Sequence, residues 1–468
     1  MLPIDIASPS RTGTIFSSPK WQSPVFKAGA AVLLLIILFW STFFPNAPNA
    51  QSDQSSAESN QVFLDSSVSK YESNAPEIQA TVTVPTLVHD PPQAQTSLPS
   101  VSPNVHATNS KEPKPIALVT GISGMIGSYV AKALVDTGRY QVHGLVRFRS
   151  KLSNLAGYVN SITLHYGDIT DSTRMRSLLR EVKPAFIYHM AAQAINGVSY
   201  DSPELTMHTN VMGTLNLLEA VKTELSLPVG THSQDTKAKH VPPCRILIAG
   251  SSTEYGQTAD EWNGPIPEDA PMKPVSPYGV SKVATEMLAF QYFRSFGIQS
   301  IVARFFIQVA AGGTEHLAMQ EFARQIAMIE RGLQPPVLKH GNLQTKRDMT
   351  DIAESAGVVV SLAEKGVPGE AYNIGSGETY KMQDLLDMML KQSKVKIAAE
   401  LDTSRLRVYD EKELVVDNQK LRKVTGWTPK PNIAHTIKQV LDYWRREVHD
   451  RYVAIGTDGD SSTIIGKQ

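Results

Sequence analysis

A tyrosine and a lysine four residues apart, Tyr278 and Lys282, are the side chains whose spacing points most directly to chemistry. Ser276 and Pro277 before them suit the N-cap and the first position of a helix, so the pair lies on one helix face. A nearby ammonium group lowers the pKa of a phenol, which readies Tyr278 to accept a proton from a hydroxyl group. The alternative is a chance pairing on an exposed helix, so the neighbouring segments have to support the assignment.

The segment GSSTEYG (residues 250–256) follows a predicted strand at 245–250. In open parallel sheets, ligands collect at the carboxyl ends of the strands. We therefore predict that Ser252 completes a catalytic set with Tyr278 and Lys282. Glu254 is a candidate general acid or base. The alternative is a turn rich in hydroxyl groups with a solvated glutamate.

Three glycines separate a predicted strand at 115–120 from a helical pattern that begins after Gly127. Gly121 permits a tight turn, Gly124 lets a pyrophosphate approach the backbone, and Gly127 lets helix and strand pack closely. The phosphates would then lie at the N-terminus of the helix, where free N–H groups favour anions. This arrangement predicts a dinucleotide site, and the alternative is a glycine-rich turn without a ligand.

The residues after the second and third predicted strands bear on which dinucleotide is bound. Arg147 follows the second strand, where an acidic residue would hold a ribose hydroxyl and an arginine pairs with a 2′-phosphate. We therefore favour NADP, with NAD possible, over a solvated arginine pair. Asp168 follows the third strand and can accept from the adenine amine, or equally cap a helix or a turn.

Alternating apolar strands and amphipathic helices after Lys114 predict an α/β fold with a doubly wound parallel sheet. The polar stretch from Ser226 to Pro243 is long for a link between helix and strand, and we expect a surface excursion. The strand candidates are PIALVT (115–120), QVHGLV (141–146), SITLHYG, FIYHMA, RILIAG (245–250) and QSIVARFF (299–306).

Residues 28–44 form an uncharged apolar run that is long enough to span a thin bilayer. Lysine and arginine precede the run at 1–27 but do not follow it until Lys70, which predicts type II topology with the bulk of the chain in a lumen, in the Golgi or the ER. A cleaved signal peptide is the alternative. The polar segment 45–112 is expected to be a flexible stem.

Composition excludes several classes of function. The chain has 45 Lys and Arg against 45 Asp and Glu among its 468 residues, so no basic excess is available for a nucleic-acid backbone. Its single cysteine, Cys244, makes neither an intramolecular disulfide nor a cysteine-rich metal site. The histidines lack ligand spacing, and we assign no metal.

The chain from about Lys114 to Val448 resembles an extended short-chain dehydrogenase/reductase of the epimerase/dehydratase family. It is most similar to the GDP-mannose 4,6-dehydratases and GDP-6-deoxy-4-ketohexose reductases. TGISGMIG, VHGLVR, LHYGDITD, IYHMAAQ, SPYGVSK, GNLQTKRDMTDI and YNIGSG carry the resemblance. It implies an NAD(P)-binding Rossmann domain at 113–307, an intertwined substrate-binding domain at 308–448 and a tail at 449–468. We expect the tail to fray from Ala454.

The resemblance implies that the family's catalytic Ser/Thr, Tyr and Lys fall on Ser252, Tyr278 and Lys282, and the dehydratase glutamate on Glu254. It also implies that Arg347 and Arg407 hold the substrate phosphates, whereas Ile307 replaces a family asparagine that meets the diphosphate. The implied cofactor contacts are Gly121, Gly124, Met125, Ile126, Gly127, Arg147, Asp168, Ile169, Ala191, Ala192, Gln193, Tyr278 and Lys282.

The implied activity is that of a GDP-mannose 4,6-dehydratase or a GDP-4-keto-6-deoxyhexose reductase. A dehydratase recycles its cofactor and needs a base at C5, for which Glu254 is the candidate. A reductase consumes NADPH. A UDP-sugar decarboxylase or epimerase of the same family and a non-catalytic NADP-binding scaffold remain alternatives. The family also implies a homodimer formed through helices.

Overall fold

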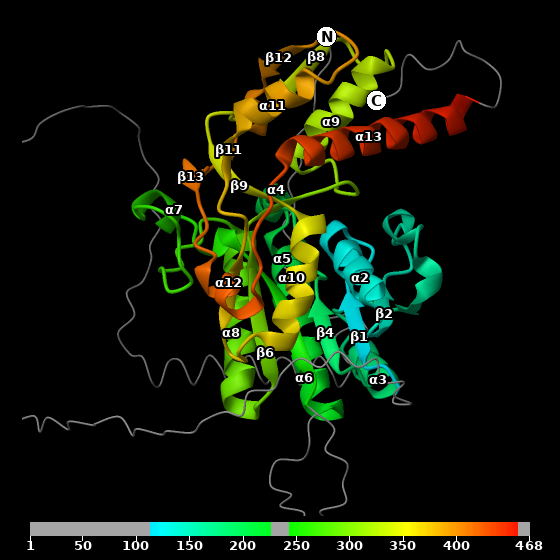
Figure 1. The fold of residues 1–468 in the computed structure, drawn as a ribbon, viewed down its shortest axis with the longest axis vertical. Coiled ribbons are helices and arrows are strands. Elements are labelled where there is room, and N and C mark those ends of the chain that lie inside the picture. Colours follow the sequence, from blue (N-terminus) through cyan, green and yellow to red (C-terminus); the bar gives the residue numbers. More distant parts are fainter. Residues whose placement is uncertain (1–112, 226–242, 457–468) are drawn as a thin grey trace, which may run out of the picture. The chain divides into compact units, whose positions relative to one another are not determined.

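The computed structural model describes residues 113–225 and 243–456 (Figure 1). The predicted tail at 1–27, the apolar run at 28–44, the stem at 45–112 and the excursion after Ser226 lie outside the described residues, apart from Pro243. Among the residues described, no helix is both long and apolar enough to cross a bilayer.

Seven parallel strands form the central sheet, in the order β10-β6-β5-β4-β1-β2-β3. All six strands predicted from the sequence are present, and the parallel Rossmann-like α/β fold is confirmed. β10, which lies at the edge beyond β6, was not predicted. The strands are β1 (Ile116–Thr120), β2 (Gln141–Val146), β3 (Ile162–Tyr166), β4 (Phe186–His189), β5 (Arg245–Ser251), β6 (Gln299–Phe305) and β10 (Ala371–Ile374).

Helices cover both faces of this sheet (Figure 1). On one face, α2 (Met125–Thr137), α10 (Ile352–Lys365) and α12 (Gln419–Thr425) bury apolar side chains against the strands. On the other, α3 (Ser172–Val182), α6 (Gly213–Glu224) and α8 (Pro277–Phe296) do the same. Both sheet faces are therefore covered, which explains why the central strands read as continuous apolar runs.

Short helical segments follow the carboxyl ends of β4 and β5. After β4 come α4 (Asn196–Asp201), α5 (Pro203–Met207) and a π-helical turn at His208–Met212 that leads into α6. After β5 come a 3₁₀ turn at Ser252–Glu254 and α7 (Thr258–Glu261). Two further 3₁₀ turns, Ser153–Leu155 and Val159–Ser161, lie between β2 and β3.

A second, smaller core lies beyond the sheet, where α9, α11 and α13 pack together. Its elements are β7 (Ile307–Val309), α9 (Ala318–Glu330), β8 (Val337–His340), β9 (Lys346–Asp351), β11 (Thr379–Lys381), α11 (Met382–Leu390), β12 (Ala398–Leu401), a 3₁₀ turn at Thr403–Arg405, β13 (Glu413–Leu414) and α13 (Ile433–Gly456).

The second unit is interrupted along the chain, and its last helix extends into the predicted tail. The chain returns from β9 into α10 and β10, which belong to the first sheet, so the unit predicted at 308–448 is not continuous. The predicted tail at 449–468 begins as helix, because α13 runs to Gly456. The prediction that the tail frays from Ala454 stays a prediction, and residues 457–468 lie outside the described part.

Candidate active site

The glycine turn between β1 and α2 has the geometry that the spacing predicted. Gly121 has a φ of +67°, and a Cβ there would lie 2.7 Å from the Cα of Ala191 at the end of β4. A Cβ on Gly127 would overlap the carbonyl oxygen of Gly121, so these two glycines permit close packing. Gly124 is exposed, and a Cβ there would meet only that same carbonyl, at 3.3 Å. Its backbone is open to a ligand.

The start of α2 and the end of β4 border this turn. Met125 and Ile126, half-buried, open the helix directly after Gly124. Ala191 N–H donates to the Thr120 hydroxyl at 3.3 Å. The backbone at these positions is therefore held in place by the protein itself, as a preformed cofactor cradle requires.

Two arginines stand exposed at the carboxyl end of β2. Within the described part of the chain, neither Arg147 nor Arg149 has an ion-pair or hydrogen-bond partner for its guanidinium group. Between them, the 85% exposed Phe148 stacks on Tyr166 of β3 with ring centroids 5.1 Å apart. Both guanidinium groups are therefore available to an anionic ligand.

Asp168 and Ile169 follow β3, which lies beside β2 in the parallel sheet. One carboxylate oxygen of Asp168 accepts from the Thr170 backbone N–H at 3.0 Å and from its hydroxyl at 2.9 Å. Ile169 is buried, and its side chain packs where a Cβ on Gly213 would otherwise go. Asp168 thus serves as a turn residue whose second oxygen has no hydrogen bond in the described residues.

Gln193 and the half-buried Ala192 also lie after β4, where an asparagine that sequence reasoning missed organises the backbone. Asn210 accepts from the Gln193 N–H at 2.7 Å, donates to its carbonyl at 3.0 Å and donates to the Ser281 hydroxyl on α8 at 2.9 Å. It lies in the π-helical turn, a feature frequent at functional sites. No periodic or motif signal marked Asn210.

Tyr278 and Lys282 lie at the start of α8, whose N-cap Ser276 accepts from the Gly279 N–H at 3.0 Å. Lys282 Nζ donates to the carbonyl of Ala249 on β5 at 2.7 Å and lies 5.8 Å from the centroid of the Tyr278 ring. The helix therefore brings the phenol and the ammonium group to one face, at the carboxyl end of β5.

The pKa values of this pair depart from the sequence prediction. Burial raises the pKa of Tyr278 to about 12, and a hydrogen bond with the Ser251 side chain opposes the rise only partly. The expected lowering of the Tyr278 pKa was therefore wrong for the protein without ligands, because desolvation outweighs the other influences. Burial also lowers the pKa of Lys282 to about 8.

Ser251, and not the predicted Ser252, lies beside Tyr278 and forms a side-chain hydrogen bond with it. The Ser251 hydroxyl accepts from the Thr253 hydroxyl at 2.8 Å and from the Thr253 N–H at 3.2 Å. Ser252 is 4% exposed and begins the 3₁₀ turn, with its carbonyl accepting from Tyr255 N–H at 3.1 Å. The geometry does not support a place for Ser252 beside the phenol.

The Glu254 side chain is enclosed in the protein interior. The residue is fully buried, and its Oε1 accepts from the Ser251 N–H at 2.6 Å. Its Oε2 lies 3.5 Å from Nε of the buried Arg304. Substrate cannot reach this carboxyl group in the structure, so the expectation of a general acid or base at Glu254 lacks geometric support.

The two predicted phosphate partners meet one carboxylate in the second unit. Arg347 is buried, donates to Asp410 at 2.7 Å and donates to the Glu411 carbonyl at 2.7 Å. Arg407 is exposed, and its guanidinium lies 3.6 Å from the same Asp410. Arg407 and Asp410 line a pocket of about 360 Å³. Arg347 is therefore held by protein groups, whereas Arg407 presents its guanidinium to solvent.

Ile307, which replaces the family asparagine, lies in β7 and packs against the core of the second unit. Its neighbour Gln308 is buried and donates to the Phe306 carbonyl at 3.0 Å, while its own carbonyl oxygen accepts from Ser355 at 2.6 Å. Neither side chain is offered to a ligand. In the described residues, no group of three or more His, Cys, Asp and Glu could hold a metal ion.

A family model described as GDP-mannose 4,6 dehydratase matches residues 118–440. The chain belongs to this family. GDP-mannose 4,6 dehydratase 1 of Arabidopsis thaliana is 29% identical over 345 residues, which cover 71% of this chain and 90% of that protein. GDP-6-deoxy-D-mannose reductase of Pseudomonas aeruginosa is 29% identical over 286 residues, covering 61% of this chain and 88% of that protein.

Solved structures agree with this membership. The structure of RMD from Pseudomonas aeruginosa complexed with NADPH matches with a TM-score of 0.59 and 25% identity, covering 71% of this chain and all of that one. UDP-glucose 4-epimerase of Thermotoga maritima shares the fold, with a TM-score of 0.60 and 23% identity. The match covers 71% of this chain and 99% of that one. The chain is an NAD(P)-dependent enzyme that acts on nucleotide sugars. The dehydratases and reductases among its relatives fit this assignment better than the UDP-sugar epimerases do.

Proposed function

We propose that the protein is an NADPH-dependent reductase of a GDP-linked 4-keto-6-deoxyhexose. The observation that carries the proposal is that the hydroxyl group and the carboxyl group of the loop after β5 lie in different places. Ser251 faces Tyr278, while Glu254 is buried beneath the loop. Reduction of a ketone needs a proton donor and a hydroxyl that positions the oxygen, and both are present.

The residues of the crevice fit a pyridine dinucleotide. The open backbone at Gly124 would hold the pyrophosphate and Lys282 the ribose next to the nicotinamide, and when bound in reduced form the cofactor supplies a hydride to the carbonyl carbon. Arg147 and Arg149 support NADPH over NADH, because both exposed guanidinium groups can pair with a 2′-phosphate.

Tyr278 donates the proton in this scheme. Because its pKa is raised to about 12, the phenol is protonated at neutral pH and is ready to donate as negative charge develops on the C4 oxygen. Ser251, which accepts from Thr253, directs its own proton to the same oxygen and stabilises that charge. The ammonium group of Lys282 stabilises the resulting phenolate.

A dehydratase would additionally remove a proton from C5, which needs an accessible base. Glu254, the candidate base in this loop, is fully buried. Thr253, half-buried at the loop surface, has no basic group. This arrangement favours reduction over elimination.

The GDP moiety is proposed from the names of the relatives, and Arg407 supports it. Its exposed guanidinium lines the pocket of about 360 Å³ and is free to pair with a diphosphate on the side away from Asp410. Arg347 pairs with Asp410 and Glu411 and would position the Asp410 carboxylate next to Arg407. Arg347 itself would contact the diphosphate only if these two pairs were broken.

The assay compares two substrates with the full-length chain. GDP-4-keto-6-deoxymannose should be reduced with one NADPH consumed per product, and Tyr278→Phe should lower the rate about 10²- to 10⁴-fold. Tyr443→Phe on α13 is the matched control. Loss of water from GDP-mannose without net NADPH consumption would establish a dehydratase instead, and turnover of UDP-sugars alone would establish the alternative substrate class.

Two further proposals concern the assembly. We propose a single-pass type II anchor at residues 28–44 with the enzyme in the lumen of the ER or Golgi, which protease protection of the full chain in sealed microsomes tests. We also propose a homodimer formed through α8. Val280, Met287 and Phe290 support it, because they recur on one helix face and remain 43, 44 and 49% exposed.

A further inference from the structure

Three charged side chains lie buried directly beneath the loop that carries Ser251. Glu254 is fully buried, Arg304 of β6 is 3% exposed and Glu286 of α8 is 6% exposed. Two carboxyl groups and one guanidinium group thus share an interior site. Their hydrogen bonds show how the charge is distributed among them.

Arg304 is committed to Glu286. Its Nε donates to Glu286 Oε2 at 2.9 Å and its Nη2 to Glu286 Oε1 at 2.5 Å, which is a bidentate pair. The remaining nitrogen, Nη1, donates to the Tyr255 hydroxyl at 2.7 Å and to the Glu268 carbonyl at 2.8 Å. Both Glu286 oxygens accept from Arg304, which leaves no guanidinium N–H of this pair for Glu254.

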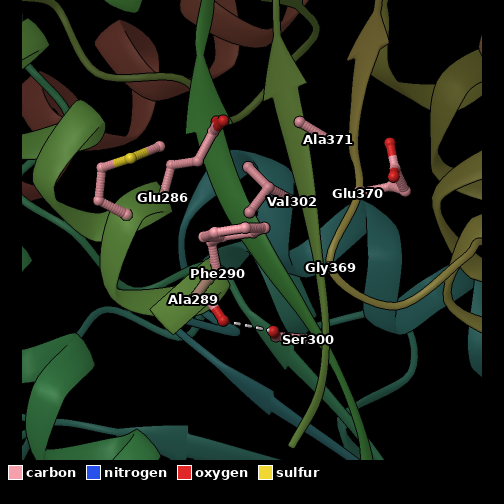
Figure 2. Close-up of a pocket in the computed structure, with 9 residues that line it drawn as sticks. Glu286, Ala289, Phe290, Ser300, Val302, Gly369, Glu370 and Ala371 are labelled. Carbon is pink, nitrogen blue, oxygen red and sulfur yellow. Dashed lines mark hydrogen bonds between the residues drawn. The ribbon is translucent and has the colours of Figure 1, made fainter. Parts of the chain in front are cut away.

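Figure 2 shows Glu286 extending from α8 beside β6, at the edge of a small pocket of about 60 Å³. Less than one helical turn further on, Ser300 of β6 donates to the carbonyl of Ala289 at 2.7 Å. The helix that carries Tyr278 and Lys282 is therefore attached to β6 by two contacts, one at Glu286 and one at Ala289. These contacts fix the position of Glu286.

Glu254 is left with one unmatched oxygen. Its Oε1 accepts from the Ser251 N–H, but in the described residues no other group donates a hydrogen bond to its fully enclosed Oε2. The nearest guanidinium nitrogen, Arg304 Nε at 3.5 Å, already donates to Glu286. An ionised oxygen in this position would be costly, whereas a protonated one would donate a hydrogen bond to the neighbouring carboxylate.

We propose that Glu254 is a neutral carboxyl group, which shares its proton with Glu286 and holds the Ser251 backbone from below as a positioning residue. Arg304 and ionised Glu286 balance each other. The loop is then fixed without a negative charge beneath the phenol that releases its proton. This last consequence, for turnover, rests on the proposed reductase function.

The other charged and titratable groups around Glu254 agree with this assignment. Lys282 of α8 directs its Nζ to the carbonyl of Ala249 and makes no ion pair within 4 Å in the described residues. The phenol of Tyr278 is uncharged at neutral pH. Burial, the charge of Glu286 and the hydrogen bond between the two carboxyl groups raise the pKa of Glu254 well above its usual value, and Arg304 opposes this only partly.

The test measures the stability of the full-length chain against pH. A carboxyl group whose folded pKa is raised keeps its proton in the folded state and loses it in the unfolded state, so wild-type stability falls as pH rises above the usual glutamate pKa. Glu254→Gln imitates the neutral form and lacks this dependence. The ratio of the wild-type to the Glu254→Gln unfolding constant should rise about tenfold per pH unit in that window.

Glu400→Gln, an exposed residue paired with Lys339, is the matched control and should parallel the wild type. A wild-type to Glu254→Gln ratio that does not change with pH would overturn the proposal. Infrared spectra of the wild type labelled with ¹³C-glutamate provide a measurement that needs no variant. They should contain the carbonyl band of a protonated glutamate at neutral pH, and carboxylate bands alone would overturn the proposal.

Turnover gives a separate readout of positioning. Glu254→Gln should keep kcat within about threefold, because an amide accepts the same Ser251 N–H and donates to Glu286, while Glu254→Ala should lower kcat with little change in KM. A folded Glu254→Gln chain without turnover would contradict the positioning role. If the wild type reduces no GDP-4-keto sugar, the proposed function fails, whereas the stability and infrared results still decide the protonation of Glu254.

Discussion

The hydroxyl of Thr253 donates a 2.8 Å hydrogen bond to the hydroxyl of Ser251. Because the Ser251 oxygen accepts from Thr253, the Ser251 proton points away from Thr253. The Ser251 hydroxyl is therefore a hydrogen-bond donor with a fixed orientation beside Tyr278. Thr253 lies in the 3₁₀ turn Ser252–Glu254, and Ser251, the last residue of β5, is the N-cap of that turn. The orientation of the donor therefore depends on the local backbone and is set before substrate binds.

This relationship predicts different effects for two adjacent serines. Ser251→Ala should lower kcat for NADPH-dependent reduction about 10²- to 10³-fold, as expected for loss of one preorganised donor to a developing oxyanion. Ser252→Ala, in a buried position away from the phenol, should change kcat less than about threefold. NADPH absorbance under substrate saturation measures both, and equal losses in the two variants would contradict the assignment.

Lys282 should destabilise the folded chain at neutral pH. The pKa of Lys282 is about 8 in the folded chain, whereas its usual value is 10.5. Between these pH values the unfolded chain keeps the lysine proton and the folded chain loses it, so the stability of the wild type rises with pH. Lys282→Met should therefore be more stable by about 3 kcal/mol at pH 7, with the difference shrinking toward pH 10, while turnover is lost. Urea unfolding at several pH values measures this, and a constant difference would argue against it.

The exposed arginines after β2 should determine the choice of cofactor. Arg147→Ala and Arg149→Ala should each raise the KM for NADPH about 10- to 100-fold, since a hydrogen bond to a charged group contributes about 1.5–3 kcal/mol, and leave the KM for NADH nearly unchanged. Arg180→Ala, which removes an exposed pair with Glu224 on α6, is the control. Parallel increases for both cofactors would exclude a role in recognising the 2′-phosphate.

Gly127 should tolerate no side chain. A Cβ there would overlap the Gly121 carbonyl oxygen between β1 and α2, so Gly127→Ala should lower the free energy of unfolding by about 2–3 kcal/mol and weaken NADPH binding. Gly157→Ala meets nothing within 4 Å and serves as the control. Chemical denaturation and fluorescence titration with NADPH report the two effects, and unchanged stability of Gly127→Ala would refute the packing argument.

The apolar face of α8 should mediate self-association. Phe290→Asp places a charge in the centre of the exposed Met287 and Phe290 surface and should convert a dimer to a monomer. Phe148→Asp, which alters a phenylalanine that is 85% exposed elsewhere, should leave the mass unchanged. Light scattering after size-exclusion chromatography measures the mass. A wild type that is already monomeric would rule the dimer out.

The sheet and the cofactor turn could be predicted because their signals are local. Apolar runs bounded by glycine and proline identify buried strands, and Gly121, Gly124 and Gly127 lie between a predicted strand and a predicted helix, which is the context of a dinucleotide-binding turn. β10 escaped prediction because its four residues, AYNI, are too short to distinguish from a loop. Its place beside β6 depends on contacts far apart in the sequence.

The composition of the loop after β5 could not predict which of its residues faces Tyr278. Ser251 and Ser252 are chemically identical, and which one faces Tyr278 depends on where the strand ends and the 3₁₀ turn begins. Glu254 looks like a catalytic carboxylate in the sequence, but Arg304, fifty residues later, and Glu286 supply the interior site that receives it. Arg347 similarly meets Asp410 and Glu411, which no nearby motif announces.

The return of the chain through α10 and β10 makes the two units inseparable. Because β10 closes the edge of the Rossmann sheet after β9 has already contributed to the second unit, the polypeptide crosses between them more than once. Expressing residues 113–307 alone would leave β6 as a bare edge, open to strand-mediated aggregation. The two units therefore have to fold together, and exchange of substrate preference among relatives must proceed through individual side chains rather than by grafting a module.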